Sequence, residues 1–273
     1  MTLAKKSLGQ NFLIDKNIIN KILGLIVLKN RNIIEIGPGK GALTEEILKK
    51  KPRSLIVIEK DDKLSNFLIK KYKSDKIIKI YNEDILKFNL EKILRKKTII
   101  FGNLPYNISS QILVKIIKFK KWPPDFLDLI FMFQKELGEK IIGKYKSYNY
   151  GRLSILTNLR LGVFNKFNVS PNCFKPRPKV NSLVIHLKPK QMLFNIKKIS
   201  NLEKITNIFF SNKRKMINKN IQKILNKYQI KKIDDLNLQA RPSEIKPEVY
   251  YKITELFEKI GWLFLAILII SSI

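Results

Sequence analysis

Short apolar runs rich in β-forming residues alternate with helix-like segments along the chain as far as Lys188. Such runs, bounded by polar and turn-forming residues, predict strands. The predicted strands are Asn32–Ile36, Leu55–Glu59, Ile77–Tyr81, Thr98–Phe101, Leu127–Phe133, Gly162–Val169 and Val180–Leu187. The first four are nearly all apolar without alternation, which is typical of parallel strands covered on both faces.

Amphipathic segments separate these strands. The predicted helices are Asp15–Leu28, Leu43–Lys51, Lys63–Lys73 and Ile108–Phe119. The alternation of strand and helix predicts an α/β fold with a doubly wound sheet. No helical segment separates the last two strands, around Val163 and Val184, so we expect an antiparallel hairpin at one edge of the sheet.

Beyond Lys188 the pattern becomes purely helical. The predicted helices there are Asn201–Phe210, Arg214–Lys227, Ile230–Leu236 and Pro247–Ile260. We therefore expect a catalytic α/β domain over residues 1–188 and a small all-helical domain over residues 189–261. The tail 262–273 contains the apolar run Trp262–Ile270, which is well short of the roughly 20 residues that span a bilayer. We assign no function to this tail and expect no membrane anchor.

The chain is strongly basic. Its 54 Lys and Arg against 22 Asp and Glu leave a net charge of +32, as expected of a protein that meets a phosphate backbone. Mutational drift in an AT-rich genome would also produce lysine runs such as Lys49–Lys51, because Lys, Ile and Asn have A- and T-rich codons. Both explanations stay open, so the motifs and not the charge must identify the partner.

Cysteine and histidine are scarce. Cys173 is the only cysteine and His186 the only histidine, so an internal disulfide is excluded. The chain also has few of the residues that a zinc site or a Ser-His triad requires. One free thiol fits a reducing cytosol. Residues Met1–Gln10 lack the long apolar stretch of a signal peptide. We expect a cytoplasmic protein that uses no metal.

A glycine-rich turn follows the first strand, in Ile36-Gly-Pro-Gly-Lys-Gly41. Glycines between a strand and a helix let the backbone approach a ligand closely and direct amide groups at it. With Ala42, Gly37 and Gly39 also satisfy the dinucleotide pattern G-x-G-x-x-[GA]. The turn alone therefore leaves NAD and S-adenosylmethionine as alternatives, together with a turn that binds nothing.

Two acidic residues follow the next two strands. Glu59 ends the second strand, where a carboxylate can accept hydrogen bonds from both ribose hydroxyls of an adenosine cofactor. Asp84 follows the third strand and can accept the adenine amine. Ligands of such sheets bind at the carboxyl ends of the strands, so suitable groups at three successive strand ends predict a cofactor site there.

The segment after the fourth strand indicates the chemistry. It reads Asn103-Leu-Pro-Tyr-Asn-Ile-Ser109. An adenine amine is a poor nucleophile because its lone pair is delocalised, but two acceptors can hold its protons and direct the lone pair at a methyl group. The Asn103 side chain and the Leu104 carbonyl are suited to this, Pro105 stiffens the turn, and a flipped base can stack on Tyr106. The alternative is a structural loop in which Asn107 or Ser109 caps the next helix.

With these motifs, the chain closely resembles the ribosomal RNA adenine N6,N6-dimethyltransferase family, in particular its bacterial small-subunit members. The resemblance covers nearly all of residues 5–260. The matching blocks are Lys5-Lys-Ser-Leu-Gly-Gln-Asn-Phe-Leu13, Glu35-Ile-Gly-Pro-Gly-Lys-Gly41, Asn103-Leu-Pro-Tyr-Asn-Ile-Ser-Ser110, Phe133-Gln-Lys-Glu136, Tyr150-Gly-Arg-Leu-Ser154, Phe174-Lys-Pro-Arg-Pro-Lys-Val-Asn-Ser182, Lys213-Arg-Lys215 and Arg241-Pro-Ser-Glu244.

The resemblance implies a Rossmann-like methyltransferase sheet that binds S-adenosylmethionine. The cofactor residues that it implies are Asn11, Leu13, Gly37, Glu59, Asp84 and Asn103, and our reading of the turn adds Gly39. Residues 103–106 then receive the target base. The implied substrate is a pair of neighbouring adenosines near the 3′ end of small-subunit (16S) rRNA, each methylated twice within an assembling 30S particle. We expect a monomer.

Six basic residues are candidates for phosphate contacts, although solvated surface charge explains any one of them equally well. They are Arg152, Arg177, Lys179, Lys213, Arg214 and Lys215. The chain departs from the family pattern in two places. Some positions of the helical domain are Lys or Asn, and the tail after Gly261 has no recognised counterpart in the family.

Three rival functions differ from this hypothesis. A non-catalytic rRNA-binding assembly factor would not need the intact Asn103–Tyr106 segment. A nicotinamide oxidoreductase does not explain Tyr106 or the basic helical domain. DNA adenine methyltransferases usually carry Asp at the position of Asn103.

Overall fold

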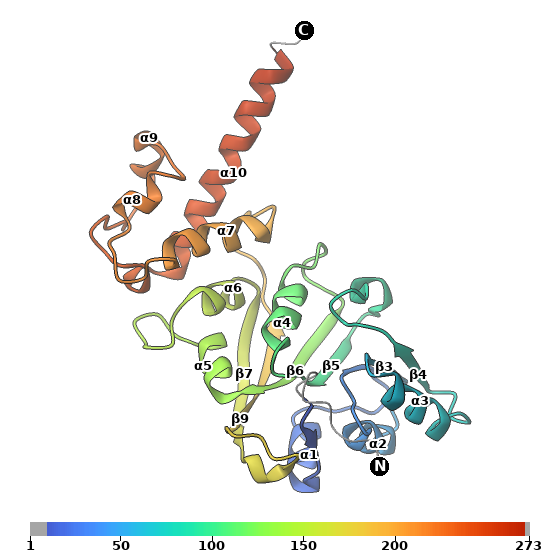
Figure 1. Cartoon of the computed structure of the whole chain (residues 1–273). Helices are drawn as coiled ribbons and strands as arrows, with labels where there is room; N and C mark the ends of the chain where they lie inside the picture. Colours follow the sequence, from blue (N-terminus) through green and yellow to red (C-terminus); the bar gives the residue numbers. More distant parts are fainter. Residues whose placement is uncertain (1–9, 271–273) are drawn as a thin grey trace. The chain divides into compact units, whose positions relative to one another are not determined.

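The computed structural model describes residues 10–270, with backbone alone for residues 260–270. The beginning of the Lys5–Leu13 block and the end of the predicted tail 262–273 therefore lie outside the described residues. The chain divides into two compact units, shown in Figure 1. Unit 1 comprises the chain up to Glu139 and residues Gly162–Pro189, and unit 2 comprises Lys140–Leu161 and the chain from Lys190 onward.

Unit 1 is built around a seven-stranded sheet with the order β4-β3-β2-β5-β6-β9-β7. Its strands are β2 (Asn32–Ile36), β3 (Ser54–Glu59), β4 (Ile78–Asn82), β5 (Thr98–Asn103), β6 (Phe126–Gln134), β7 (Leu161–Val169) and β9 (Ser182–Pro189). The pairs from β4 through β6 are parallel and β9 is antiparallel to β6. The seven predicted strands are thus present, and β9 and β7 are neighbours at one edge as expected.

The central strands are buried on both faces, as their unbroken apolar sequences require. Neighbouring residues such as Ile33 and Ile34 point to opposite faces, and both are about 1% exposed. One face packs against helices α1 (Lys16–Leu23) and α2 (Ala42–Lys49), through Ile22 and Ile47 among others. Helices α3 (Asp62–Lys71) and α4 (Ser109–Ile117) complete the predicted set.

Two elements of unit 1 consist of only two residues each. Strands β1 (Phe12–Leu13) and β8 (Phe174–Lys175) pair antiparallel, with Phe12 opposite Lys175 and Leu13 opposite Phe174. The amide of Ile14 donates to the carbonyl of Cys173 at 2.9 Å and extends the pairing. This small sheet brings together two of the motif blocks that are far apart in the sequence. Strands of two residues are too short to show a period in the sequence, so this sheet was not predicted.

Unit 2 is helical. It contains α6 (Arg152–Arg160), α7 (Ile199–Phe210), α8 (Asn218–Ile221), α9 (Lys227–Ile230) and α10 (Pro247–Ile270), while α5 (Lys135–Ile141) spans the boundary between the units. Tyr250 of α10 is fully buried against Phe209 and Phe210, and its hydroxyl donates to the Pro242 carbonyl at 2.7 Å. The predicted domain boundary at 188 coincides with the return of the chain to this unit, but residues 140–161 belong to unit 2 and not to the α/β unit.

The predicted helices Arg214–Lys227 and Ile230–Leu236 are wrong. Only the short α8 and α9 form there, separated by turns. Asparagine is a poor residue inside helices and a good one at their starts, and Asn226 begins a new helix at Lys227. Its side chain accepts from the Gln229 amide at 2.9 Å, and the Gln229 side chain accepts from the Asn226 amide at 3.0 Å. Helix α10, by contrast, is longer than predicted and continues ten residues past its predicted end at Ile260.

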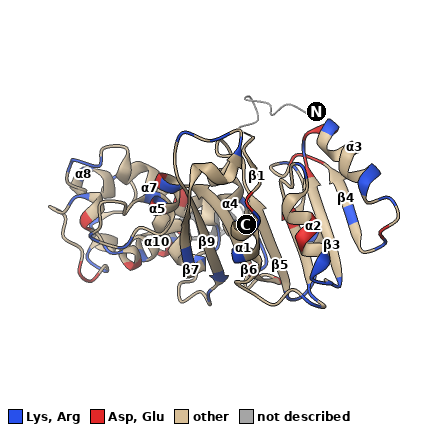
Figure 2. Cartoon of the chain, turned by 90° about the horizontal axis from the view of Figure 1, so that it is seen from below, with Lys and Arg blue, Asp and Glu red and all other residues tan. Residues whose placement is uncertain are grey.

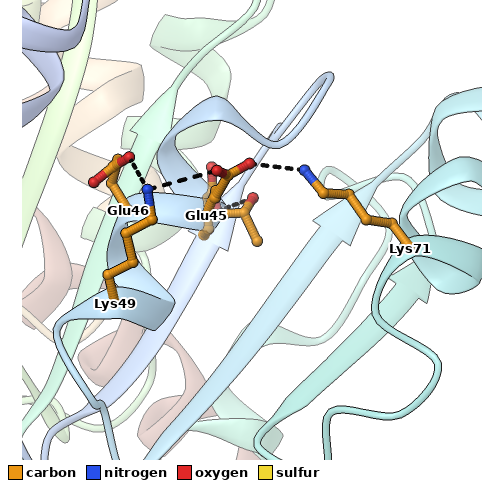
Figure 3. Close-up of polar contacts among 6 residues, drawn as sticks. Glu45, Glu46, Lys49 and Lys71 are labelled. Atoms are coloured by element: carbon orange, nitrogen blue, oxygen red, sulfur yellow. Dashed lines mark hydrogen bonds and ion pairs between the residues drawn. The ribbon is translucent and has the colours of Figure 1, made fainter.

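Lys and Arg residues occur in both units and are not confined to one element (Figure 2). Some of them are paired with acids. Lys71 of α3 reaches Glu45 of α2 at 2.8 Å, and Lys49 contacts Glu46 at 2.7 Å and Glu45 at 3.6 Å (Figure 3). Exposed pairs of this kind contribute little to stability, typically below about 1 kcal/mol each. This part of the positive charge is balanced locally and is not free to meet a phosphate backbone.

Candidate active site

The carboxyl ends of β2, β3, β4 and β5 open into a cavity of about 420 Å³. This volume lies in the ordinary range for small-molecule sites. All residues predicted to bind the cofactor or the base line it, namely Asn11, Leu13, Gly37, Gly39, Glu59, Asp84, Asn103, Leu104, Pro105 and Tyr106. The parallel topology explains their convergence, because successive strand ends meet at one edge of the sheet.

Gly39 is needed at its position for two reasons. Its φ of +60° lies in the left-handed region that L side chains rarely adopt. A Cβ atom there would also stand 2.6 Å from the ring of Phe12, so any side chain would force this ring to move. Gly37 has a φ of +67° as well. The turn thus keeps its backbone open to the cavity.

Glu59 contacts the backbone of the glycine turn through its carboxylate. Its Oε2 accepts from the Gly39 amide at 3.1 Å and its Oε1 from the Asp61 amide at 2.9 Å. The side chain is buried, and this burial raises the pKa of its carboxyl, while the two amide hydrogen bonds oppose the rise. Each carboxylate oxygen has a second lone pair, so the group can still accept from a ligand's hydroxyls.

Glu35 is a site residue whose role the sequence reasoning missed. It lines the cavity from within β2 and accepts from the Thr44 hydroxyl at 2.6 Å. Burial raises the pKa of the Glu35 carboxyl to about 8, the Thr44 hydrogen bond opposes the rise, and the charge of Glu59 adds to it. Glu35 is therefore largely uncharged at neutral pH, and Glu59 is the carboxyl that contacts the backbone of the turn. A carboxyl in an otherwise apolar strand was the available signal.

Asp84 is held by two further groups. Its Oδ2 pairs with Lys60 at 2.8 Å and its Oδ1 accepts from the Leu86 amide at 2.9 Å. The Lys60 hydrogen bond is the main cause of the lowered pKa of Asp84, so this carboxylate stays ionised. Lys115 of α4 donates to the carbonyls of Leu86 and Phe88, each at 2.7 Å, and fixes the loop that carries Asp84. Lys60 and Lys115 were not predicted, since no local motif marks them.

Asn103 ends β5 and is fixed by the N-terminal segment. Its Nδ2 donates to the Asn11 carbonyl at 3.0 Å. A carbonyl can only accept, so this bond determines which way the amide is turned and leaves Oδ1 as the acceptor of this side chain. Leu104 is buried. Gly102 leaves room for the Leu104 side chain, because a Cβ at Gly102 would lie 2.5 Å from Leu104 Cδ2.

Tyr106 lines the cavity with its hydroxyl anchored. The hydroxyl lies 2.6 Å from Ser182 Oγ at the start of β9, and Ser182 is fully buried. Burial raises the pKa of Tyr106, so its hydroxyl stays protonated. The proposed helix-capping role of Asn107 or Ser109 does not hold: α4 begins without a side-chain cap, and the Ser109 hydroxyl donates to the Tyr106 carbonyl at 3.2 Å.

Comparison with known proteins decides the family. Residues 1–259 match the family model described as "Ribosomal RNA adenine dimethylase". The chain belongs to this family. The predicted family resemblance, the α/β Rossmann-like methyltransferase fold and the enzyme class are thereby confirmed. Membership of a methyltransferase family also favours S-adenosylmethionine over the NAD alternative that the glycine turn left open.

Individual relatives agree with the family model. The chain is 45% identical over 256 residues to "Ribosomal RNA small subunit methyltransferase A" of Pelagibacter ubique, covering 93% of this chain and 97% of that protein. Identity to the protein of the same name from Mycoplasma mobile is 38% over 249 residues, with 90% and 95% covered. Among solved structures, a dimethyladenosine transferase from Plasmodium falciparum is similar with a TM-score of 0.75 and 26% identity, covering 92% of this chain and 98% of that chain.

The six basic residues predicted to contact RNA phosphates are all exposed, and they are distributed over both units. Arg177 and Lys179 follow β8 in unit 1, Arg152 begins α6 in unit 2, and the run Lys213–Lys215 lies in a turn after α7. No helix among residues 10–270 has the length and apolar character required to cross a membrane.

His186 lies apart from the cavity, in the sheet. Its Nε2 is 2.6 Å from Asp128 Oδ1, both side chains are buried, and Lys188 lies 3.7 Å from the same oxygen. The described part of the chain contains no cluster of three His, Cys, Asp or Glu side chains suited to a metal ion.

Proposed function

We propose that this enzyme transfers methyl groups from S-adenosylmethionine to N6 of two neighbouring adenosines near the 3′ end of small-subunit rRNA, each methylated twice. The observation that supports this site most directly is the Asn103 amide, turned by the Asn11 carbonyl so that Oδ1 is its acceptor. Two relatives at 45% and 38% identity are named for small-subunit rRNA, which supports that RNA as the substrate.

The residues of the cavity fit the cofactor. We assign the ribose hydroxyls to the Glu59 carboxylate, the adenine amine to Asp84, and the remaining backbone contacts to the glycine turn and to Asn11 and Leu13. When bound, S-adenosylmethionine supplies a methyl group on a positively charged sulfur. Glu59 Oε2 and Oε1 accept from the Gly39 and Asp61 amides, and their remaining lone pairs suit a ligand that presents hydroxyls at the turn.

The chain's own groups then prepare the adenine amine. Asn103 Oδ1 and the Leu104 carbonyl accept its two N–H groups, which draws the nitrogen lone pair out of conjugation with the ring. Tyr106 supplies the face on which the flipped base stacks, and its hydroxyl bond to Ser182 fixes the ring. Bound S-adenosylmethionine would supply the methyl carbon and leave as the neutral thioether, and the methylated N6 would lose one proton to water. Positioning supplies most of the acceleration in such a displacement.

Transfer of labelled methyl groups tests the proposal. Small subunits that lack the modification are incubated with the enzyme and labelled S-adenosylmethionine, and the rRNA is digested to nucleosides. We expect N6,N6-dimethyladenosine at two adjacent positions near the 3′ end. Binding of the particle without any methyl transfer would instead indicate a non-catalytic assembly factor.

A first prediction concerns the anchor of Tyr106. Ser182→Ala and Tyr106→Phe each remove the hydrogen bond between the two hydroxyls, so we expect each to lower kcat/KM for RNA by roughly three- to tenfold, the worth of one hydrogen bond. Because both changes remove the same bond, the double variant should be no worse than either single one. Cofactor affinity, measured by calorimetry, should stay unchanged. Additive losses in the double variant would mean that Ser182 does not act through Tyr106.

A second prediction concerns the run Lys213–Lys215. Reversing its three charges to Glu should weaken RNA binding at least tenfold and flatten its dependence on salt, because fewer counterions are released. Cofactor affinity should be unaffected. The matched control reverses Lys49, Lys50 and Lys51, an exposed run of equal charge at the end of α2. An equal loss of affinity in both triple variants would count against a specific RNA contact at residues 213–215.

A further inference from the structure

One tyrosine of unit 2 stands fully in solvent. Tyr148, between α5 and α6, has a relative exposure of 101%, whereas its neighbours Tyr145 and Tyr150 are partly and almost fully buried. Both faces of this ring are therefore available to a partner.

The two neighbouring tyrosines anchor this loop. The Tyr145 hydroxyl donates to the Glu244 carbonyl and the Tyr150 hydroxyl to the Ile245 carbonyl, each at 2.8 Å. Their rings meet edge to face with centroids 5.8 Å apart. Both sides of Tyr148 are thus attached to the same short segment of unit 2.

The backbone of the loop is also tightly closed. The Ser147 amide donates to the Lys144 carbonyl at 2.9 Å and the Tyr150 amide to the Ser147 carbonyl at 3.1 Å. A Cβ at Gly143 would stand 2.3 Å from the Asn149 carbonyl oxygen, so only glycine permits this closure. The backbone beneath the ring is thus preorganised, so a partner that binds there does not have to order the loop.

The loop that carries Tyr148 is positively charged. Lys144, Lys146 and Arg152 flank it in sequence and are exposed, and residues 140–161 contain no Asp or Glu. An isolated aromatic ring among cations suits single-stranded nucleic acid, in which bases stack on the ring and phosphates meet the cations. A protein partner is less favoured, because protein interfaces are depleted in lysine.

We infer that Tyr148 is a stacking platform for an unpaired base of the substrate RNA, with Lys144, Lys146 and Arg152 contacting the adjoining phosphates. This inference rests on the proposed function, since it adds an RNA contact to that enzyme. The contact is separate from the target adenine, which the cavity of unit 1 receives. Base stacking of this type tolerates different sequences, because every base has an aromatic face.

The test compares Tyr148→Ala with Tyr148→Phe in the full-length enzyme. Binding is measured on unmodified small subunits and on a naked rRNA fragment that contains the target adenosines. We expect Tyr148→Ala to raise Kd for both RNAs by about 5- to 100-fold, the usual range for loss of one stacked base, and Tyr148→Phe to stay within about twofold of the wild type. Tm and cofactor affinity should not change, because the side chain contacts nothing in the folded protein.

Three results would overturn the inference. These are unchanged RNA affinity in Tyr148→Ala, an equal loss in Tyr148→Phe, and a loss on the particle that is absent on the naked fragment, which would indicate a protein contact. Tyr228→Ala is the matched control, because Tyr228 is 67% exposed in the same unit but has Lys232 Nζ 4.1 Å from its ring centroid. An equal loss in that control would likewise overturn a specific role of Tyr148. Failure of the wild type to methylate small subunits would instead refute the proposed function.

Discussion

Replacing Asn103 with alanine is expected to lower the rate of methyl transfer by about 10²–10³-fold, the effect of removing one preorganised hydrogen-bonding group from an active site. The change deletes Oδ1, the proposed acceptor of an adenine N–H, and also the amide that binds the Asn11 carbonyl. Cofactor affinity should fall far less than the rate, because the Glu59, Asp84 and glycine-turn contacts are kept. Single-turnover transfer and cofactor calorimetry on the same preparation separate the two effects.

Asn103→Asp is the informative companion variant. It keeps an oxygen acceptor for the adenine amine but places a second oxygen where Nδ2 donates to the Asn11 carbonyl, so two acceptors would face each other. We expect a clear loss of rate in this variant too, because the acceptor would no longer be held in place. Turnover at the wild-type level in Asn103→Ala would remove the proposed role altogether.

Glu59→Ala is expected to act on the cofactor and not on the base. It removes the acceptor of the Gly39 and Asp61 amides and the proposed acceptor of the ribose hydroxyls. We expect Kd for S-adenosylmethionine to rise by roughly 10- to 100-fold, since hydrogen bonds to charged groups contribute about 1.5–3 kcal/mol. At saturating cofactor, kcat should recover much of its value.

The control for this prediction removes a carboxylate outside the cavity. Glu46 of α2 pairs with the exposed Lys49, so Glu46→Ala changes the net charge equally but should leave Kd within about twofold. Calorimetry at a temperature where both variants are fully folded gives the comparison. A cofactor Kd in Glu59→Ala that matches this control would contradict the assignment.

The sequence predicted the sheet well because burial on both faces leaves a continuous apolar signal, as in Asn32–Ile36 and Thr98–Phe101. It also predicted which residues would converge, since Gly37, Glu59, Asp84 and Asn103 each end or follow a parallel strand, and such ends share one edge. In unit 2 the prediction failed between residues 214 and 236, where asparagines start and interrupt helices that the apolar pattern alone would continue.

The supporting groups of the site were beyond the reach of sequence patterns. Ser182 contacts Tyr106 across 76 residues and the Asn11 carbonyl meets Asn103 across 92 residues, so no local spacing connects them. Lys60 and Lys115 are ordinary surface residues in a chain with 54 basic side chains, and only their contacts with Asp84 and with its loop distinguish them. Long-range pairs of this kind follow from the fold and not from a motif.

The most direct test of the account is a crystal structure of the enzyme with S-adenosylmethionine and a short RNA containing the target adenosines. The account predicts the cofactor methyl group directed at the turn of residues 103–106, with the base on Tyr106 and its N6 within hydrogen-bonding distance of Asn103 Oδ1 and the Leu104 carbonyl. A methyl group directed away from this turn, with no room for a base between them, would contradict it.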